Sequence, residues 1–306
     1  MAEKKILRVY LNPDMLDHAR NGGFNFVNRI ANALEPRGFR IEFRKNSDVE
    51  RLKSAGRKGY SLFLMDDPIH AKALTMRRSY FYPFWRIEAS AKRWEFEVAQ
   101  TPFDAATIDG AAATDWADKW RKWLFKGEAK AVSRDGPIYV PLQGKLLRQR
   151  SFQSTSPVEM LDLTATRFPA HVILAGLHPG EVYSEKERLA LDGLRQKHPN
   201  LTITTGDMTQ ALKTCRLVVT QNSSAAFFGY FFHKPAVLFG KIDFHHIASN
   251  THDLGIDDAF TAALGSQPEF DRYLYWFTMM NAIRADAEDC EDQILKTLAR
   301  RGWQVD

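Results

Sequence analysis

The sequence contains few cysteines, and this scarcity excludes two common kinds of small scaffold. Cys215 and Cys290 are the only two in 306 residues, and they lie far apart without the spacing of metal ligands. A disulfide framework needs several cysteine pairs, and a structural zinc site needs four closely grouped Cys or His ligands. The sequence therefore predicts neither a disulfide scaffold nor a zinc site.

Long apolar runs are also missing. No segment approaches the roughly 20 consecutive apolar residues that are needed to span a bilayer. The first residues, Met1 to Lys5, are charged and lead directly into a short apolar run rather than into a signal peptide. These two features predict a cytoplasmic protein.

Neither sign of charge dominates the sequence. There are 42 Lys and Arg against 37 Asp and Glu, so the formal net charge is +5. Basic residues gather at 37–45 and 51–58, either as solvated surfaces or as a positive field that attracts an anionic ligand. They are not interleaved with aromatic residues in a recurring pattern, and no recognition motif is present, so we expect no nucleic-acid partner.

The length indicates two domains, because a single core rarely organises more than about 250–300 residues. A hydrophobic content of 44% supplies enough apolar side chains for two cores. In the first half, apolar runs and helical periodicity alternate, and Pro36 and Gly38 end one predicted helix. This alternation predicts a parallel sheet with crossover helices, with strands at 6–11, 39–44 and 60–65 and helices at 24–34 and after Ser47.

The segment 68–99 departs from this alternation because it is rich in Arg and aromatic residues, and we expect loops or short helices there. A further helix is predicted at 114–125. The polar segment 127–136 contains two glycines and marks the expected domain boundary. The expected domains are therefore 1–130 and 131–267, followed by a mostly helical tail at 268–306 that packs back on the first domain.

The second half alternates more regularly and predicts a doubly wound α/β domain, whose ligands bind at the carboxyl ends of the strands. Its predicted strands are 138–142, 171–177, 201–205, 217–220 and 236–239. Its predicted helices are 157–167, 184–197, 208–214 and 224–232.

Polar residues follow one predicted central strand in the sequence Leu177-His178-Pro179-Gly180. A histidine at the carboxyl end of a strand can donate to a phosphate or contact a base. The alternative is an ordinary turn, since a second His-Pro pair at His198-Pro199 lies before a strand, at the opposite edge of the sheet. Both interpretations of His178 remain open from the sequence.

A second polar turn, Thr220-Gln221-Asn222-Ser223-Ser224, lies between a strand and an apolar helix. Asn and Ser are typical helix caps, but a cap needs only one of them. Several polar side chains at a helix N-terminus, with no acidic residue in the turn, are typical of an anion site. Lys241 follows the next strand, and the adjacent His245 and His246 lack the spacing of metal ligands.

Four short motifs together resemble the capsule polysaccharide biosynthesis proteins. They are Pro141-Leu142-Gln143, His178-Pro179, Gln221-Asn222-Ser223-Ser224, and Lys234-Pro235 with Phe239-Gly240-Lys241. This family includes bacterial retaining Kdo transferases, which have a GT-B-like fold and use CMP-activated sugar. The resemblance covers roughly residues 136–249, and Arg86-Ile87-Glu88 in the first half is similar to the start of the family's Arg-x-Glu-Asp-Gly segment.

The resemblance implies an α/β fold of two Rossmann-like domains, GT-B-like, with a helical tail. It implies a cytoplasmic glycosyltransferase of surface polysaccharide biosynthesis that needs no cofactor. Its implied partners are a nucleotide-sugar donor such as CMP-Kdo, a saccharide or glycolipid acceptor, and the inner membrane or a polysaccharide-assembly complex as a peripheral contact. The nucleotide would be held by Gln143, His178, Pro179, Gln221, Asn222, Ser223, Ser224 and Lys241.

A glycosyl-transfer site also needs a carboxylate near the anomeric carbon, and the candidates in the first half are Glu88, Asp66 and Asp67. An ion pair with a neighbouring Arg is the alternative for Glu88, and capping of a following helix is the alternative for the two aspartates. We expect the acceptor to meet Arg77, Arg78, Trp85 and Arg86. No Asp-x-Asp motif is present, so we expect no metal.

Two further functions remain open. Ala89 and Ser90 follow Glu88 where the family segment has Asp and Gly, and this difference favours a catalytically silent protein that binds a nucleotide sugar or a polysaccharide. The other alternative is a nucleotide-sugar epimerase of the same architecture, which would need several cleft carboxylates.

Overall fold

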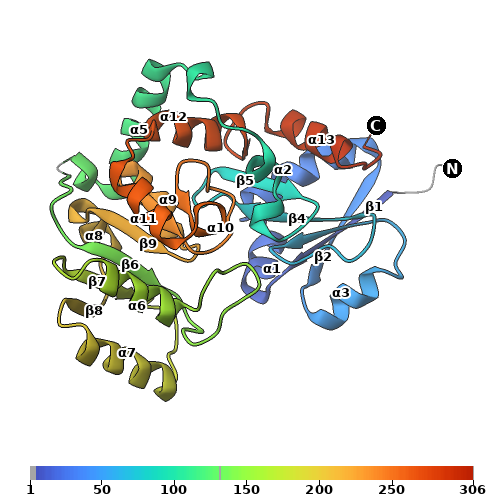
Figure 1. Cartoon of the computed structure of the whole chain (residues 1–306). Coiled ribbons are helices and arrows are strands. Elements are labelled where there is room, and N and C mark those ends of the chain that lie inside the picture. The colour runs from blue at the N-terminus through green and yellow to red at the C-terminus, as the bar shows by residue number, and fades with distance from the viewer. Residues whose placement is uncertain (1–4, 131, 306) are drawn as a thin grey trace. The chain divides into compact units, whose positions relative to one another are not determined.

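The computed structural model describes residues 5–130 and 132–305 as two compact α/β units. Unit 1 comprises the described residues up to Thr101 together with those from Phe277 onward, and unit 2 comprises Pro102–Trp276. Figure 1 shows that each unit consists of one sheet flanked by helices.

The sheet of unit 1 has six strands in the order β12-β5-β4-β3-β1-β2 (Figure 1). Neighbouring strands among β1, β2, β3 and β4 are parallel, whereas β5 is antiparallel to both of its neighbours, β4 and β12. The strands are β1 Lys5–Leu11, β2 Phe39–Lys45, β3 Tyr60–Leu64, β4 Ala73–Arg78, β5 Phe84–Glu88 and β12 Ile283–Arg284. The α-helices are α1 Pro13–Arg20, α2 Asn25–Leu34, α3 Asp48–Ser54, α4 Glu97–Gln100 and α13 Cys290–Arg300.

The sheet of unit 2 also has six strands, in the order β11-β10-β9-β6-β7-β8, and all neighbours are parallel. The strands are β6 Ile138–Leu142, β7 Ile173–Leu177, β8 Leu201–Thr205, β9 Leu217–Thr220, β10 Ala236–Leu238 and β11 Ser249–Asn250. The α-helices are α5 Gly110–Phe125, α6 Pro157–Arg167, α7 Glu185–Lys197, α8 Met208–Thr214, α9 Ser224–Phe231, α10 Thr251–Leu254, α11 Ile256–Gly265 and α12 Phe270–Tyr275.

Several helices begin at a residue whose side chain caps them. The Ser47 side chain accepts a hydrogen bond from the Glu50 N–H at the start of α3, 3.2 Å away. Asp109 accepts from the N–H groups of Ala111 and Ala112 at the start of α5, four residues earlier than we expected. Side-chain oxygens at these positions satisfy N–H groups that have no partner within the helix.

The expectation of loops or short helices at 68–99 is wrong for β4 and β5. Local composition was misleading because the polar residues of β5 are buried by distant partners. Arg86 donates to the carbonyl oxygen of Phe277, 2.8 Å away, and Glu88 pairs with Arg301. Trp85 and Ile87 belong to the apolar core of unit 1, so both faces of this strand are covered.

The C-terminal segment is mostly helical, as expected, and α13 packs against α2 within unit 1. A π-helix, Trp276–Met280, precedes β12. The division between units lies after Thr101, whereas we expected it after residue 130; residue 131, the first of the expected second domain, lies outside the described residues.

Helix α5 belongs to unit 2 because it packs against α12. The buried Arg121 of α5 donates to the carbonyl oxygen of Phe231, 2.8 Å away, and its guanidinium pairs with the Asp271 carboxylate. Burial alone would raise the pKa of Asp271, but hydrogen bonds from His233 and Arg121 hold it below its usual value. This carboxylate is therefore charged and paired at neutral pH.

We expect Arg121→Leu to lower the free energy of unfolding of unit 2 by about 3 kcal/mol, because it removes the guanidinium that pairs with the half-buried Asp271 carboxylate. A carboxyl group whose pKa is lowered by folding, such as Asp271, stabilises the folded state at pH values above its unfolded-state pKa. This stabilisation is lost as the pH falls through the folded-state pKa. The deficit should therefore shrink in acid, as measured by urea unfolding at several pH values. Arg195→Leu, which breaks an exposed pair with Asp192, should change stability by less than about 0.5 kcal/mol.

Candidate functional site

The strand order of unit 2 reverses beside β6. Strands β7 and β8 lie on one side of β6, and β9, β10 and β11 lie on the other. In open parallel sheets, the crevice at the carboxyl ends of the strands on either side of such a reversal is where ligands bind. The turns after β6 and β9 carry Gln143 and the polar run 220–224, so the topology brings these two motifs to the reversal point.

The two turns are joined by hydrogen bonds. The Thr220 hydroxyl donates to the carbonyl oxygen of Pro141, 3.2 Å away. The Gln221 amide donates to the carbonyl oxygen of Thr155 at 3.1 Å. The carbonyl oxygen of the Gln221 side chain is buried and has no hydrogen-bond partner within the described ranges. It is therefore an acceptor that is open to a ligand or to water, since such groups are rarely left unpaired.

Gln143 and Gln221 line one small pocket at this point. The pocket measures about 10 Å³, and Arg150 also lines it. Burial lowers the pKa of Arg150 from its ordinary value, while Glu181 opposes this shift. The pocket is only about large enough for one water, so a larger group would have to displace the segment that carries Arg150.

The start of α9 faces the same edge of the sheet. The Ser223 hydroxyl accepts a hydrogen bond from the Ala225 N–H at 3.2 Å, so Ser223 caps this helix. Asn222 and Ser224 are half-buried and are not needed as the cap. The helix terminus and these polar side chains together suit an anionic group.

His178 follows β7 and is exposed. Its Nδ1 atom accepts a hydrogen bond from the Gly180 N–H, 3.1 Å away, and the backbone N–H of His178 donates to the Tyr183 hydroxyl. Because Nδ1 is an acceptor, the proton of the neutral ring lies on Nε2. The turn formed with Pro179 and Gly180 thus presents an N–H donor to solvent.

His178, Ser223 and Lys241 follow different strands and lie at different distances along the edge of the unit 2 sheet. Strand β6 lies between β7 and β9, and neighbouring strands are about 4.8 Å apart. The backbones next to His178 and Ser223 are therefore about 10 Å apart, so these two residues can meet on one phosphate group only through their side chains. Lys241, exposed and located after β10, lies farther along the same edge.

Glu181 is a site residue that the sequence analysis missed. A Cβ atom on Gly144 would lie 2.2 Å from the Glu181 carboxylate, so this carboxylate covers the turn after β6. Glu181 lies three residues after His178, which was the only available signal in the sequence. A carboxylate in this position can accept hydrogen bonds from hydroxyl groups and repels phosphate.

In unit 1, Glu88 lies near the edge formed by the carboxyl ends of the parallel strands. The strand register aligns it with Thr75 of β4, Phe63 of β3 and Tyr10 of β1. Phe63 and Tyr10 are each one residue before the end of their strand. Glu88 therefore stands at the level where Rossmann-like sheets bind ligands.

The environment of Glu88 combines burial with positive charge. The residue is 4% exposed, and its side chain pairs with Arg301 and accepts from the Glu97 N–H at 3.3 Å. Burial raises the pKa of Glu88, and the charges of Arg301 and Arg86 oppose this shift without cancelling it. The charge of Arg86 therefore acts to lower the pKa of Glu88, but the net direction is upward.

Glu88, Trp85 and Arg86 line a cavity of about 360 Å³, a volume within the usual range for small-molecule sites. Two of these residues have structural roles as well. The Trp85 ring stacks on Phe26 with centroids 4.7 Å apart, and Arg86 donates to the carbonyl oxygens of Phe277 and Asn281. The other walls come from α4, α13 and the segment 279–283.

The two aspartates after β3 lie in different surroundings. Asp66 is paired with Arg51, 3.3 Å away, and accepts from the Asn46 side chain. Asp67 is exposed and accepts from the Ala91 N–H at 2.8 Å. The following element is β4 rather than a helix, so neither aspartate caps a helix. Of the expected acceptor residues on β4, Arg77 is half-buried and Arg78 is exposed.

Within residues 5–130 and 132–305, no three His, Cys, Asp or Glu side chains are grouped so that they could hold a metal ion. In the same part of the chain, no helix has both the length and the apolar character to cross a bilayer.

No family model matches the sequence, and no curated protein matches it. Among solved structures, the chain is similar to KpsC of Thermosulfurimonas dismutans, described as a beta Kdo 2,7 transferase. The identity is 11%, the TM-score is 0.54, and the match covers 97% of this chain and 99% of the other. The UDP-GlcNAc 2-epimerase of Neisseria meningitidis matches at 10% identity and a TM-score of 0.38, covering 97% of this chain and 100% of the other.

At these identities the likeness concerns the fold alone, and only the match with the higher TM-score supports an argument. The α/β fold of two Rossmann-like, GT-B-like domains with a helical C-terminal end, as predicted from the sequence, is confirmed.

Proposed function

We propose that the protein is a glycosyltransferase that takes its sugar from a nucleotide-linked donor. The observation that carries this proposal is the reversal of strand order beside β6 in unit 2. There, Gln143, the turn 220–224 and the start of α9 share the edge at which such sheets hold nucleotides.

Each part of a nucleotide has a suitable partner at this edge. The phosphate would lie at the start of α9, next to Asn222, Ser223 and Ser224, where N–H groups and the helix dipole favour an anion. The buried, unpaired oxygen of Gln221 suits an amino group of a base, and cytosine carries such a group. A base there requires the segment bearing Arg150 to move, because the present pocket is too small.

The departing phosphate would be stabilised by hydrogen-bond donors of the protein rather than by a metal. His178 presents an N–H at Nε2, and Lys241 supplies a positive charge on the same edge. Donors that are already oriented before the reaction stabilise developing negative charge most effectively. The donor sugar that we propose is Kdo, linked to CMP, as the motifs shared with the capsule polysaccharide biosynthesis family imply.

We assign the catalytic carboxylate to Glu88 ahead of Asp66 and Asp67. Glu88 lines a cavity of ligand size and its pKa is raised by burial, a combination typical of carboxyl groups that exchange protons with substrates. The acceptor saccharide would approach this cavity past Arg77 and Arg78, while Trp85 and Arg86 shape its wall.

A catalytically silent nucleotide-sugar binding protein is the second candidate, and two observations favour it. Glu88 is already engaged by Arg301, and the residues after it, Ala89 and Ser90, differ from the family segment. An ion-paired, buried carboxylate is also what a purely structural role would look like.

Two measurements test the proposal. A thermal-shift panel with cytidine, uridine, guanosine and adenosine nucleotides should show stabilisation by cytidine nucleotides, since a ligand at about 100 times its Kd adds roughly 2.7 kcal/mol. Product analysis with CMP-Kdo, alone and with a saccharide acceptor, then separates transfer from silent binding. Stabilisation without any product would favour the binding protein, and the absence of stabilisation by every nucleotide would contradict both.

A further inference from the structure

The net positive charge of the chain is concentrated in one short segment. Residues 37–58 contain eight Lys and Arg and three Asp and Glu, an excess that equals the net charge of the whole chain, +5. The segment comprises the edge strand β2, helix α3 and the loop that follows α3. A protein whose charge is localised in this way has an electrostatic preference for an anionic partner on that side.

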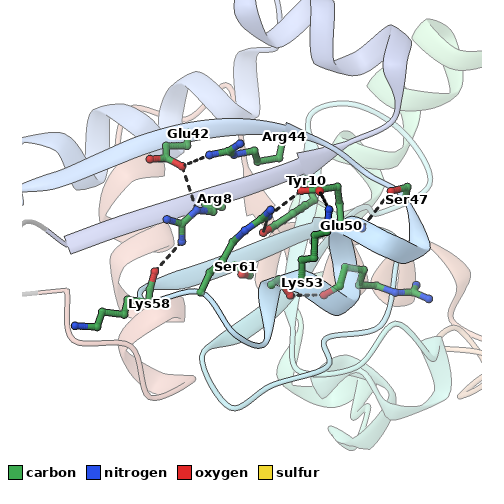
Figure 2. A network of polar contacts seen from close by, with 12 residues as sticks. Arg8, Tyr10, Glu42, Arg44, Ser47, Glu50, Lys53, Lys58 and Ser61 are labelled. Atoms are coloured by element: carbon green, nitrogen blue, oxygen red, sulfur yellow. Dashed lines mark hydrogen bonds and ion pairs between the residues drawn. The ribbon is translucent and has the colours of Figure 1, made fainter.

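Arg40 and Arg44 of β2 lie on the same face of the sheet as the loop after α3. Arg8 of β1 donates to the Glu42 carboxylate at 3.0 Å and to the carbonyl oxygen of Lys58 at 2.7 Å (Figure 2). Arg40 and Arg44 contact the same carboxylate, at 2.6 Å and 3.0 Å. Burial alone would raise the pKa of Glu42, but these arginines hold it below its usual value. Three arginines on one charged carboxylate leave a positive excess on this face.

Helix α3 is held rigidly beside this cluster. Glu50 of α3 is hydrogen-bonded to Arg57 at 2.8 Å, and Arg57 reaches the Tyr10 hydroxyl of β1 at 3.1 Å (Figure 2). Ser47 caps the helix. The helix is therefore fixed by its inner side to the sheet, and its outer side is available.

Two large apolar side chains are exposed on the outer side of α3, next to the exposed Asp48 carboxylate, which pairs with Arg51. Val49 is 59% exposed and Leu52 is 70% exposed, and residues three apart lie on one helix face. Lys53 next to them is also exposed, as are Arg44, Lys45 and Lys58 around the helix. Exposed apolar side chains flanked by Lys and Arg are the features by which proteins bind the surface of an anionic bilayer.

We infer that this surface, formed by Arg40, Arg44, Lys45, Val49, Leu52, Lys53 and Lys58, binds the headgroup region of a membrane that contains anionic lipid. The basic residues attract the lipid phosphates, and Val49 and Leu52 enter the boundary between headgroups and acyl chains. A soluble polyanion would use the positive charges but would gain little from the two apolar side chains. The inference does not depend on the proposed transferase activity, because it uses none of the site residues.

Sedimentation with vesicles tests the inference. The full-length protein should bind vesicles of phosphatidylglycerol and phosphatidylcholine, should not bind vesicles of phosphatidylcholine alone, and should be released by about 0.5 M salt. We expect Leu52→Ser to weaken binding about tenfold, because it removes most of the apolar contact. Lys45→Gln and Lys53→Gln should each weaken it about fivefold at low salt.

Matched variants on α7 serve as controls. Leu189 is 63% exposed on that helix, beside the exposed Lys186, so Leu189→Ser and Lys186→Gln should leave vesicle binding unchanged. Circular dichroism of each variant checks that it folds. Equal loss of binding in the α3 and α7 variants would contradict the inference.

Two further outcomes would also overturn it. One is the absence of binding to anionic vesicles. The other is a pair of results: the protein binds dextran sulfate as tightly as vesicles, and Leu52→Ser binds vesicles as tightly as the wild type does. This pair would identify a polyanion site instead. The nucleotide thermal-shift panel reports on the transferase proposal separately, so failure of one is distinguishable from failure of the other.

Discussion

Glu88→Gln is expected to reduce sugar transfer by about 10²-fold or more while leaving nucleotide affinity unchanged. Glutamine keeps the shape of the side chain and removes the proton that a catalytic carboxyl group exchanges, and loss of general acid–base catalysis is of this size. Nucleotide affinity should be unaffected because the proposed nucleotide groups belong to unit 2. Transfer is measured with CMP-Kdo and acceptor, and affinity by thermal shift.

Glu97→Gln is the matched control for this variant. Glu97 lines the same cavity, and its carboxylate lies 3.0 Å from the same Arg301 guanidinium. It is half-exposed and its charge is not needed in the proposed reaction, so transfer should fall less than about fivefold. If both variants lose transfer equally, the loss comes from the ion pair with Arg301. If Glu88→Gln retains normal transfer, Asp66 and Asp67 become the candidates.

Glu88→Gln should also change how the stability of unit 1 depends on pH. The pKa of Glu88 is raised in the folded state, so between the unfolded and folded values the native state holds a proton that the unfolded state has lost. The free energy of unfolding of unit 1 therefore falls as pH rises through this interval. Glu88→Gln should remove that part of the slope in urea unfolding measured from about pH 4 upward. An unchanged slope would show that Glu88 does not titrate differently in the two states.

His178→Ala is expected to weaken binding of the nucleotide by about 10- to 100-fold, the effect of losing one hydrogen bond to a charged group. The Nδ1 atom of His178 is occupied by the Gly180 N–H, so Nε2–H is the donor that the phosphate would lose. Titration calorimetry with CMP measures this change. His178→Asn, which retains an N–H donor on a shorter side chain, should lose less affinity than the alanine variant.

His171→Ala is the control for the histidine variant. His171 precedes the same strand, at the amino end of β7, so it lies at the edge of the sheet that does not hold ligands in this fold. Its replacement should leave nucleotide affinity unchanged. If His178→Ala also leaves the nucleotide Kd unchanged, His178 is only a turn residue, and the start of α9 binds the nucleotide without it.

The strands and helices of unit 2 were accessible from the sequence because their signals are local. Buried parallel strands are continuous apolar runs, as in 217–219, and the helices between them carry their own caps, as at Ser156 and Ser184. The positions of the polar turns after β7 and β9 follow from the same pattern. Chain direction alone brings such turns to one edge of a parallel sheet, so candidates such as His178 and Ser223 needed no tertiary information.

Strand order and distant partners, in contrast, were decided only by the tertiary structure. The reversal beside β6, which brings Gln143 next to Gln221, depends on which strands pair, and no local pattern specifies that. Arg301 meets Glu88 across 213 residues of sequence, and burial raises the pKa of the Glu88 carboxyl group against the opposing charge of this arginine. A single sequence reports the preferences of neighbouring residues, whereas burial and charge at Glu88 result from long-range packing, which is why its surroundings could not be predicted.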